Sequence, residues 1–302
     1  MEKKMVAVLS ESFRQGLLNR RDFIQKVVLS AGGAFAAGHV LGRLGYEPEL
    51  IREARAENQQ IVTMDVSYPS GDQTVSAYLA KPAGEGPFPT MIVIHEIFGL
   101  TAFAKDVARL FARSGFLALA PELIPPPGEA LPDGRHAQWM LDTLATGVAR
   151  VPAPELVKLL DGYTWLSARK DVDAGHIGSV GFCWGGARSF SLATLQPNLW
   201  VAVVFYGSSP PFEDLGAINA PVLALYGALD NSSATSITGR AAETARAMMA
   251  LRKPFEWEVY NQAPHGFFRE GAGSDPTSHV AETRPANIAR ELMFDFLDRR
   301  YS

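Results

Sequence analysis

The stretch at residues 179–186 reads Ser-Val-Gly-Phe-Cys-Trp-Gly-Gly and contains Cys183, the single cysteine of this 302-residue chain. An apolar run precedes it and a helical pattern follows it, which is the context of a nucleophile elbow. Such a strand–turn–helix bend needs glycine two positions on either side of the nucleophile, and Gly181 and Gly185 stand there. The elbow would place Cys183 at a helix N-terminus, where backbone amides favour the reactive thiolate. A buried structural cysteine is the alternative, and the flanking patterns favour the nucleophile.

A nucleophile of this kind needs a general base, and the base needs an acid that orients it. Residues 222–230 place Asp230 just past an apolar strand pattern, and His265 comes just past the last such pattern. Taken singly, Asp230 could be a turn residue and His265 a loop residue. Cys183, Asp230 and His265 nevertheless follow predicted strands in the order nucleophile, acid, histidine, which is the order of α/β-hydrolases. This order predicts a catalytic triad.

Two backbone amides are expected to hold the oxyanion that forms when such a nucleophile attacks a carbonyl group. One belongs to Trp184, the residue after the nucleophile, and the other to Ile97, in the loop after the strand predicted at 91–95. That loop begins His95-Glu96 but is not a zinc-protease signature, because Gly99 stands where the second histidine would be needed.

From residue 61 onward, short apolar runs alternate with helical patterns, which predicts an α/β fold with a mostly parallel sheet and helices on both faces. The first two strand patterns alternate in the antiparallel manner, and the later ones are continuous apolar runs typical of buried parallel strands. Strands are expected at 61–67, 75–80, 91–95, 116–120, 177–181, 201–206, 222–226 and 255–260, and helices at 104–113, 153–169, 184–195, 234–251 and 285–300. Residues 122–150 break the alternation with a Pro/Gly-rich stretch, which is either a cover over a ligand site or an irregular surface excursion.

The first 56 residues carry nine Lys+Arg against six Asp+Glu, whereas the whole chain has a net charge of −4. Arg20-Arg21, an aromatic residue two positions on and a Gly/Ala-rich apolar stretch resemble a twin-arginine export signal. The apolar stretch is short and glycine-rich for a membrane span, so no stable membrane insertion is expected. We therefore expect a leader at 1–56 that contacts the twin-arginine export machinery transiently, and a periplasmic or secreted domain at 57–302. A retained surface helix on a cytoplasmic protein is the alternative.

Composition excludes several classes of protein. Apolar residues make up 47% of the chain and charged residues 20%, which is ordinary for a globular protein. There is no basic surplus to neutralise phosphates, so a nucleic-acid partner is not expected. A single cysteine excludes an internal disulfide and a thiolate zinc site, and it disfavours a thiol redox protein, because no second cysteine could resolve a disulfide.

Three motifs, at 95–99 (His-Glu-Ile-Phe-Gly), 181–186 (Gly-Phe-Cys-Trp-Gly-Gly) and 265–267 (His-Gly-Phe), resemble the dienelactone hydrolase family. The resemblance extends from about residue 61 to the C-terminus and implies an eight-stranded α/β-hydrolase sheet, a Cys-His-Asp triad and no cofactor. It also implies that Glu96 contacts the nucleophile and helps to form the thiolate when substrate binds. Two features depart from the best-known members of the family. Those members carry glutamine at the position of His95, and they lack an export signal. Both departures bear on which substrate this chain cleaves.

Arginines hold the substrate carboxylate in that family. Arg269, four residues after His265, matches one of them, and a guanidinium fork suits a planar carboxylate. Arg135 is a candidate for the second, and Trp139 for the pocket wall, both within the irregular segment. These features predict a hydrolase of small activated esters or lactones, dienelactone-like and carboxylate-bearing, that acts through a cysteine acyl-thioester. The alternatives are a broader carboxylesterase or thioesterase, and a non-catalytic exported binding protein on the same fold.

Overall fold

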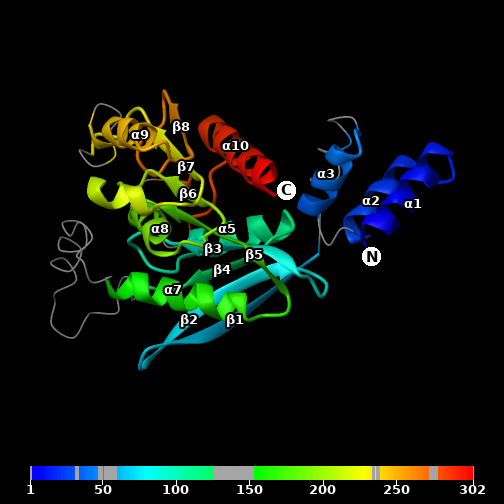
Figure 1. Cartoon of the computed structure of the whole chain (residues 1–302), viewed down its shortest axis with the longest axis horizontal. Coiled ribbons are helices and arrows are strands. Elements are labelled where there is room, and N and C mark those ends of the chain that lie inside the picture. Colours follow the sequence, from blue (N-terminus) through cyan, green and yellow to red (C-terminus); the bar gives the residue numbers. More distant parts are fainter. Residues whose placement is uncertain are drawn as a thin grey trace.

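The computed structural model describes residues 2–30, 34–46, 50, 60–124, 153–232, 235, 239–271 and 278–301. Within these ranges eight strands form one sheet in the order β1-β2-β4-β3-β5-β6-β7-β8 (Figure 1). β2 pairs antiparallel with β1 and with β4, and all other neighbours are parallel. The strands are β1 (Ile61–Ser70), β2 (Gln73–Pro82), β3 (Phe88–Ile94), β4 (Leu117–Pro121), β5 (Val172–Phe182), β6 (Ala202–Phe205), β7 (Val222–Gly227) and β8 (Phe255–Tyr260).

The predicted sheet is confirmed, with differences at strand ends that have local causes. β1 continues three residues past the predicted end at 67, because a two-residue turn starting at Gly71 carries the pairing up to Ser70 opposite Gln73. Gly71 has a φ of 58°, a conformation that glycine adopts without a Cβ clash. β6 ends one residue early, at Phe205, because Tyr206 turns the chain with a φ of 41°.

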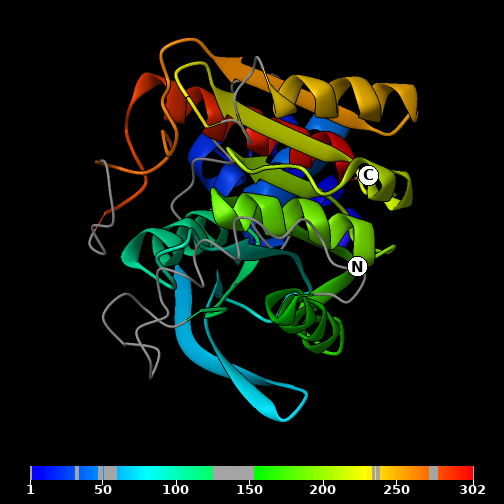
Figure 2. The same ribbon diagram turned by 90° about the vertical axis from the view of Figure 1, so that its left-hand side faces the viewer.

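Helices cover both faces of the sheet, as predicted. They are α5 (Ala102–Arg113), α7 (Pro154–Ser167), α8 (Trp184–Leu195), α9 (Arg240–Ala250) and α10 (Arg284–Arg300), with a 3₁₀ helix, η1 (Phe212–Ala217), after β6. α7 starts one residue later than predicted, with Pro154 in its first turn, where the missing N–H of proline has no cost. Figure 2 shows how the sheet twists from the β1–β2 hairpin at one end to β8 at the other.

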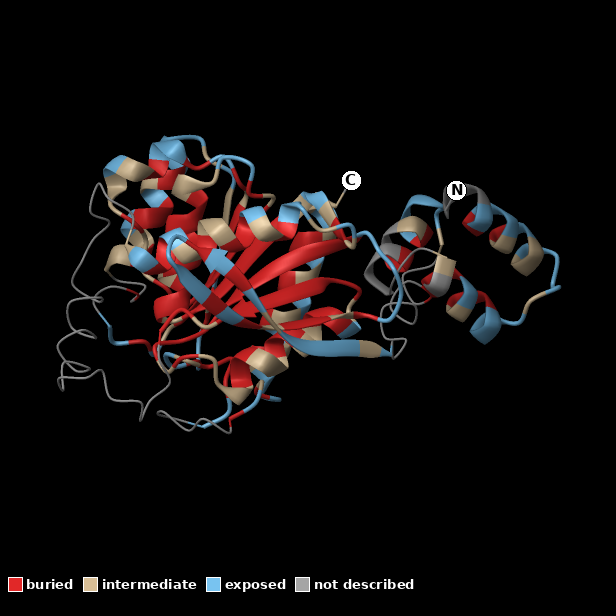
Figure 3. Ribbon diagram, turned by 90° about the horizontal axis from the view of Figure 1, so that it is seen from below, coloured by how far each residue is buried: buried red, intermediate tan, exposed pale blue. Residues whose placement is uncertain are grey.

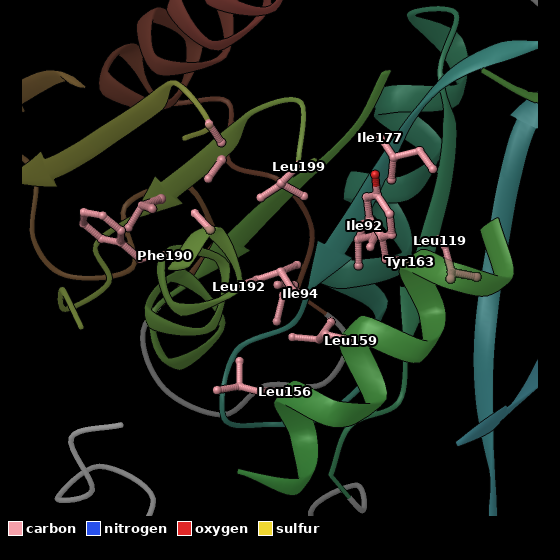
Figure 4. Packing of buried hydrophobic residues seen from close by; sticks show 14 of the residues in the cluster. Ile92, Ile94, Leu119, Leu156, Leu159, Tyr163, Ile177, Phe190, Leu192 and Leu199 are labelled. Atoms are coloured by element: carbon pink, nitrogen blue, oxygen red, sulfur yellow. The ribbon is translucent and has the colours of Figure 1, made fainter. Parts of the chain in front are cut away.

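Side chains that alternate along the central strands divide the core between the two faces. Ile92 and Ile94 of β3 point to the face covered by α7 and α8, where they pack with Leu156 and Leu192 (Figure 4). Met91 and Val93 point to the opposite face and pack with aromatic side chains of α5 and α10. β3 is buried on both faces, so its carboxyl end is held firmly in place, and the loop that carries Glu96 and Ile97 starts there.

The segment predicted as a leader contains three helices, α1 (Glu2–Arg14), α2 (Arg20–Ser30) and α3 (Ala34–Arg43). Their apolar side chains pack against one another around Phe23, which is buried and stacks on Phe13 with the ring centroids 4.4 Å apart. Figure 3 shows these helices beside the sheet domain rather than on it. No helix within the described ranges is long and apolar enough to cross a membrane. The role of this segment in export remains a prediction.

Candidate active site

The strand–turn–helix bend at Cys183 has the geometry of a nucleophile elbow. β5 ends at Phe182 and α8 begins at Trp184, so Cys183 alone makes the turn, with a φ of 55° that is strained for a residue with a Cβ. A Cβ at Gly181 would overlap the backbone of Gly185. Both predicted glycines are therefore required by close backbone contacts, and the turn lifts Cys183 above the carboxyl edge of the sheet.

His265 and Asp230 meet at the same edge, from the loops after β8 and β7. His265 Nδ1 donates a hydrogen bond of 2.7 Å to Asp230 Oδ2. Asp230 is buried, and it also accepts from the Thr235 hydroxyl at 2.7 Å and from the Ser232 backbone amide at 2.9 Å. Burial raises the pKa of this carboxyl, but the hydrogen bonds outweigh it and lower the pKa below its usual value. Asp230 therefore remains an anion that orients His265.

Cys183 completes the chain of contacts, because its side chain is hydrogen-bonded to His265. Burial would lower the pKa of His265, but the bonds to Asp230 and Cys183 outweigh burial and raise it to about 10. His265 is thus protonated at neutral pH, and a positive imidazolium faces the sulfur. The imidazolium is therefore placed to stabilise the negative charge that the sulfur of a cysteine nucleophile carries when it attacks.

Glu96 lies beside this triad but is held by Arg269. The Arg269 Nε and Glu96 Oε2 atoms are 2.7 Å apart, and both side chains are buried. Burial raises the pKa of Glu96, while the positive charges of Arg269 and His265 oppose that rise. Arg269 is held further by a bond of 3.3 Å from its Nη1 to the Ser278 hydroxyl. Arg269, which was predicted to bind the carboxylate of the substrate, is therefore already paired with Glu96, a carboxylate of the protein itself.

Tyr206, the residue that ends β6, adds a buried ring to the same site. Its ring meets that of His265 edge-on, with centroids 5.0 Å apart. Burial and the negative charges of Glu96 and Cys183 raise the pKa of its hydroxyl. Tyr206 therefore stays neutral and encloses the imidazole on one side.

His95 fixes the positions of the loop that carries the proposed oxyanion amide of Ile97. The ring is fully buried and lies parallel to that of Trp184, with centroids 5.6 Å apart. Its Nδ1 is 2.6 Å from the Glu96 carbonyl oxygen, and its Nε2 accepts from the Leu123 amide at 3.1 Å. Only a neutral ring with its proton on Nδ1 satisfies both bonds, and burial lowers the pKa to about 4. No motif in the sequence indicates this structural role for His95.

Trp184 opens α8, where the first backbone amides have no acceptor within the helix. Trp184 directly follows Cys183, and Ile97 lies in the loop after β3; the role of their amides as an oxyanion hole remains a prediction. Arg135 and Trp139 lie outside the described residues. In the described ranges, no group of three or more His, Cys, Asp or Glu side chains could hold a metal ion.

A pocket of about 980 Å³ opens at the triad. Its lining includes all three triad residues and two arginines, Arg188 of α8 and Arg240 of α9. Neither arginine was predicted. Arg188 follows the 181–186 motif closely, and its place on the helix after the elbow is the signal that could have found it, whereas Arg240 stands in a helical pattern with no motif around it. Tyr206 and Ser208, which follow β6, also line the pocket.

The fold and the elbow together define an α/β-hydrolase. The family model described as "Dienelactone hydrolase family" matches residues 75–300. A protein named "Putative carboxymethylenebutenolidase" from Escherichia coli O157:H7 is 36% identical over 73% of this chain and 82% of its own length. A protein of the same name from Methylorubrum extorquens is 32% identical over 68% of this chain and 72% of its own length. The crystal structure of a "Putative Dienelactone Hydrolase" from Klebsiella pneumoniae superposes with a TM-score of 0.67 at 30% identity, covering 79% of this chain and 98% of that one.

The chain therefore belongs to the dienelactone hydrolase family and is a carboxylic-ester hydrolase. A second structure, of a dienelactone hydrolase-like phosphotriesterase from metagenomic libraries, has a TM-score of 0.68 at 23% identity over 80% of this chain and 99% of that one, and this likeness concerns the fold alone.

Proposed function

We propose that this enzyme cleaves small activated esters or lactones through an acyl-thioester on Cys183. The thiolate attacks the carbonyl carbon, and the amides of Ile97 and Trp184 bind the resulting oxyanion. The tetrahedral adduct collapses when the carbon–oxygen bond of the ester breaks, and His265 gives its proton to the leaving oxygen. The neutral imidazole then takes a proton from water, which attacks the thioester and releases the acid and the thiolate. The hydrogen-bonded chain from Asp230 through His265 to Cys183 is the observation that supports this mechanism.

Glu96 and Arg269 suggest how a carboxylate-bearing substrate would engage the site. A substrate carboxylate that pairs with Arg269 would displace Glu96 from its 2.7 Å contact. The released Glu96 would then lie free beside Cys183 and could accept the thiol proton, so that the thiolate forms when substrate is present. Arg269→Ala should therefore slow acidic substrates much more than neutral ones.

The relatives carry the name carboxymethylenebutenolidase, and a dienelactone is the substrate class we propose for this chain. Thioesters react slowly with water unless a base is well placed, which favours activated substrates such as enol lactones. The test compares dienelactone hydrolysis by the full chain and by Cys183→Ala, with an unactivated alkyl ester measured alongside. Activity that survives in Cys183→Ala, or equal turnover of the alkyl ester, would contradict the proposal.

A broader carboxylesterase is the second candidate, and the pocket favours it. A volume of about 980 Å³ is near the upper end of the range for sites that hold drug-sized ligands, and a small lactone would leave much of it empty. Hydrolysis of a panel of neutral aryl esters of increasing size, at rates equal to that of a dienelactone, would support this candidate.

We also propose that residues 1–56 direct twin-arginine export. The paired Arg20 and Arg21 are exposed at the start of α2, where export machinery could reach them. Intact-mass measurement of protein from the native host tests this, with an Arg20→Lys, Arg21→Lys variant as the comparison. An uncleaved chain that stays in the cytoplasm would contradict the proposal.

A further inference from the structure

Arg240, the first residue of α9, lines the same pocket as Cys183 and is held in place by three contacts. Arg240 Nε donates to the Ser209 hydroxyl at 3.1 Å, and its Nη2 donates to the Pro210 carbonyl at 3.0 Å. The guanidinium carbon lies 4.4 Å from the centre of the Phe212 ring, over the ring face. Two hydrogen bonds and a stacked ring therefore hold the guanidinium in one orientation, which lowers the cost of binding a planar ligand to it.

The charge of Arg240 has no counter-ion among the described residues, in contrast to the other arginines of the site. Arg188 lines the same pocket but is paired with Glu155 at 2.8 Å. Arg269 is paired with Glu96. Glu213 also lines the pocket, but it is exposed and, among the described residues, forms no ion pair with Arg240. Arg240 therefore supplies an uncompensated positive charge to a ligand in this pocket.

Ser209 can take part in the same contact. Its oxygen accepts from Arg240, and within the described part of the chain its hydroxyl proton has no acceptor. A carboxylate placed at the open edge of the guanidinium could accept from both groups. Pro211, Phe212 and Leu229 also line the pocket and give it an apolar wall, which suits an apolar linker.

We propose that Arg240 and Ser209 form an anion subsite for a carboxylate at the end of the substrate remote from the scissile ester. The substrate class is a monoester of a dicarboxylic acid whose apolar chain spans the pocket. This subsite is separate from Arg269, which would receive a carboxylate close to the reacting carbonyl. The inference rests on the proposed ester hydrolysis and extends it to longer substrates.

The test uses p-nitrophenyl esters of linear dicarboxylic acids, from four to eight carbons, each with a free terminal carboxylate or with that carboxylate as its methyl ester. The measured quantity is the ratio of kcat/KM for the acid to kcat/KM for the methyl ester at each length. The ratio should rise with chain length to a maximum in the full-length protein. Arg240→Gln should lower that maximum about ten- to a hundredfold, the loss expected for a hydrogen bond to a charged group.

Arg246→Gln is the matched control, because Arg246 is exposed on the same helix and does not line the pocket. It should leave both the ratio and the hydrolysis of the methyl esters as in the unchanged protein. Arg240→Lys, which keeps the charge but loses the planar fork, should give an intermediate ratio and serves as the comparison if Arg240→Gln does not fold.

The outcomes separate the two proposals. If the unchanged protein hydrolyses neither the acids nor the methyl esters, the proposed ester hydrolysis has failed. If it hydrolyses the methyl esters but shows no preference for the long acids, the subsite is overturned. The subsite is also overturned if Arg269→Gln removes that preference while both Arg240 variants retain it.

Discussion

Gly185→Ala should damage the site without touching any group that takes part in chemistry. A Cβ at residue 185 would lie 2.8 Å from the carbonyl carbon of Ile94 and closer still to the carbonyl oxygens of Ile94 and His95. Ordinary van der Waals contact begins near 3.4 Å, and the nearest carbonyl oxygen sets the shift that is needed, so α8 must retreat from β3 by about 1 Å. These neighbours are backbone atoms of a strand buried on both faces, and they cannot move aside as a flexible side chain could.

The retreat separates the two elements that carry the proposed oxyanion amides, Ile97 after β3 and Trp184 in α8. A displacement of roughly 1 Å can reduce a catalysed rate about 100-fold, so a displacement of this size should lower kcat/KM about ten- to a hundredfold. Overpacking of this kind should also lower the free energy of unfolding by about 1–3 kcal/mol.

The assay is steady-state hydrolysis of a p-nitrophenyl ester, with urea unfolding of the same protein to show that it is folded. Gly216→Ala is the matched control, because a Cβ at Gly216 of η1 would meet no atom within 4 Å. It should change neither quantity. If Gly185→Ala hydrolyses the ester as fast as the unchanged protein, the close approach of α8 to β3 does not position the oxyanion site and the reasoning is wrong.

Three further perturbations test the surrounding contacts. Asp230→Asn should lower kcat by a factor on the order of 10²–10⁴, because an amide does not stabilise the imidazolium of His265; pre-steady-state acylation measures this. The pKa of His265 is raised to about 10, so its stabilising effect is complete below its unfolded pKa of about 6.5 and is lost as the pH rises through 10. The difference in unfolding free energy between the unchanged protein and His265→Ala should therefore narrow from pH 7 to pH 11, and a constant difference would contradict this. His95→Phe keeps the stacking on Trp184 but leaves the buried Leu123 amide without its acceptor, so it should lower the free energy of unfolding in urea by about 1–3 kcal/mol. His95→Gln can still accept this hydrogen bond and should lower that free energy by less.

Much of the fold could be predicted because its signals are local. Continuous apolar runs such as 222–226 identify buried parallel strands, and glycines at fixed offsets identify the elbow at Cys183. The order Cys183, Asp230, His265 places three side chains at one sheet edge, because the carboxyl ends of parallel strands lie together. The structure does bring these three side chains into one hydrogen-bonded chain.

The partners of the charged side chains could not be predicted in the same way. Arg269 matches a carboxylate ligand by its spacing from His265, yet it contacts Glu96, which is far away in the sequence. Arg240 begins a helix with no motif, and it reaches the pocket only because α9 packs beside η1. The apolar residues near Phe23 suggested a leader, and the structure shows that they also form a small cluster of their own.

The sequence by itself therefore determined the class of fold, the family and the residues that could form the triad, since each depends on residue type and spacing along the chain. Only the tertiary structure decided which charges are paired and which are open to a ligand. Ion pairing depends on distances of a few ångströms between side chains that are remote in sequence, and those distances are set by how helices pack on the sheet. For this reason Arg269 is found neutralised by Glu96, and Arg240 is found facing the pocket with its charge uncompensated among the described residues.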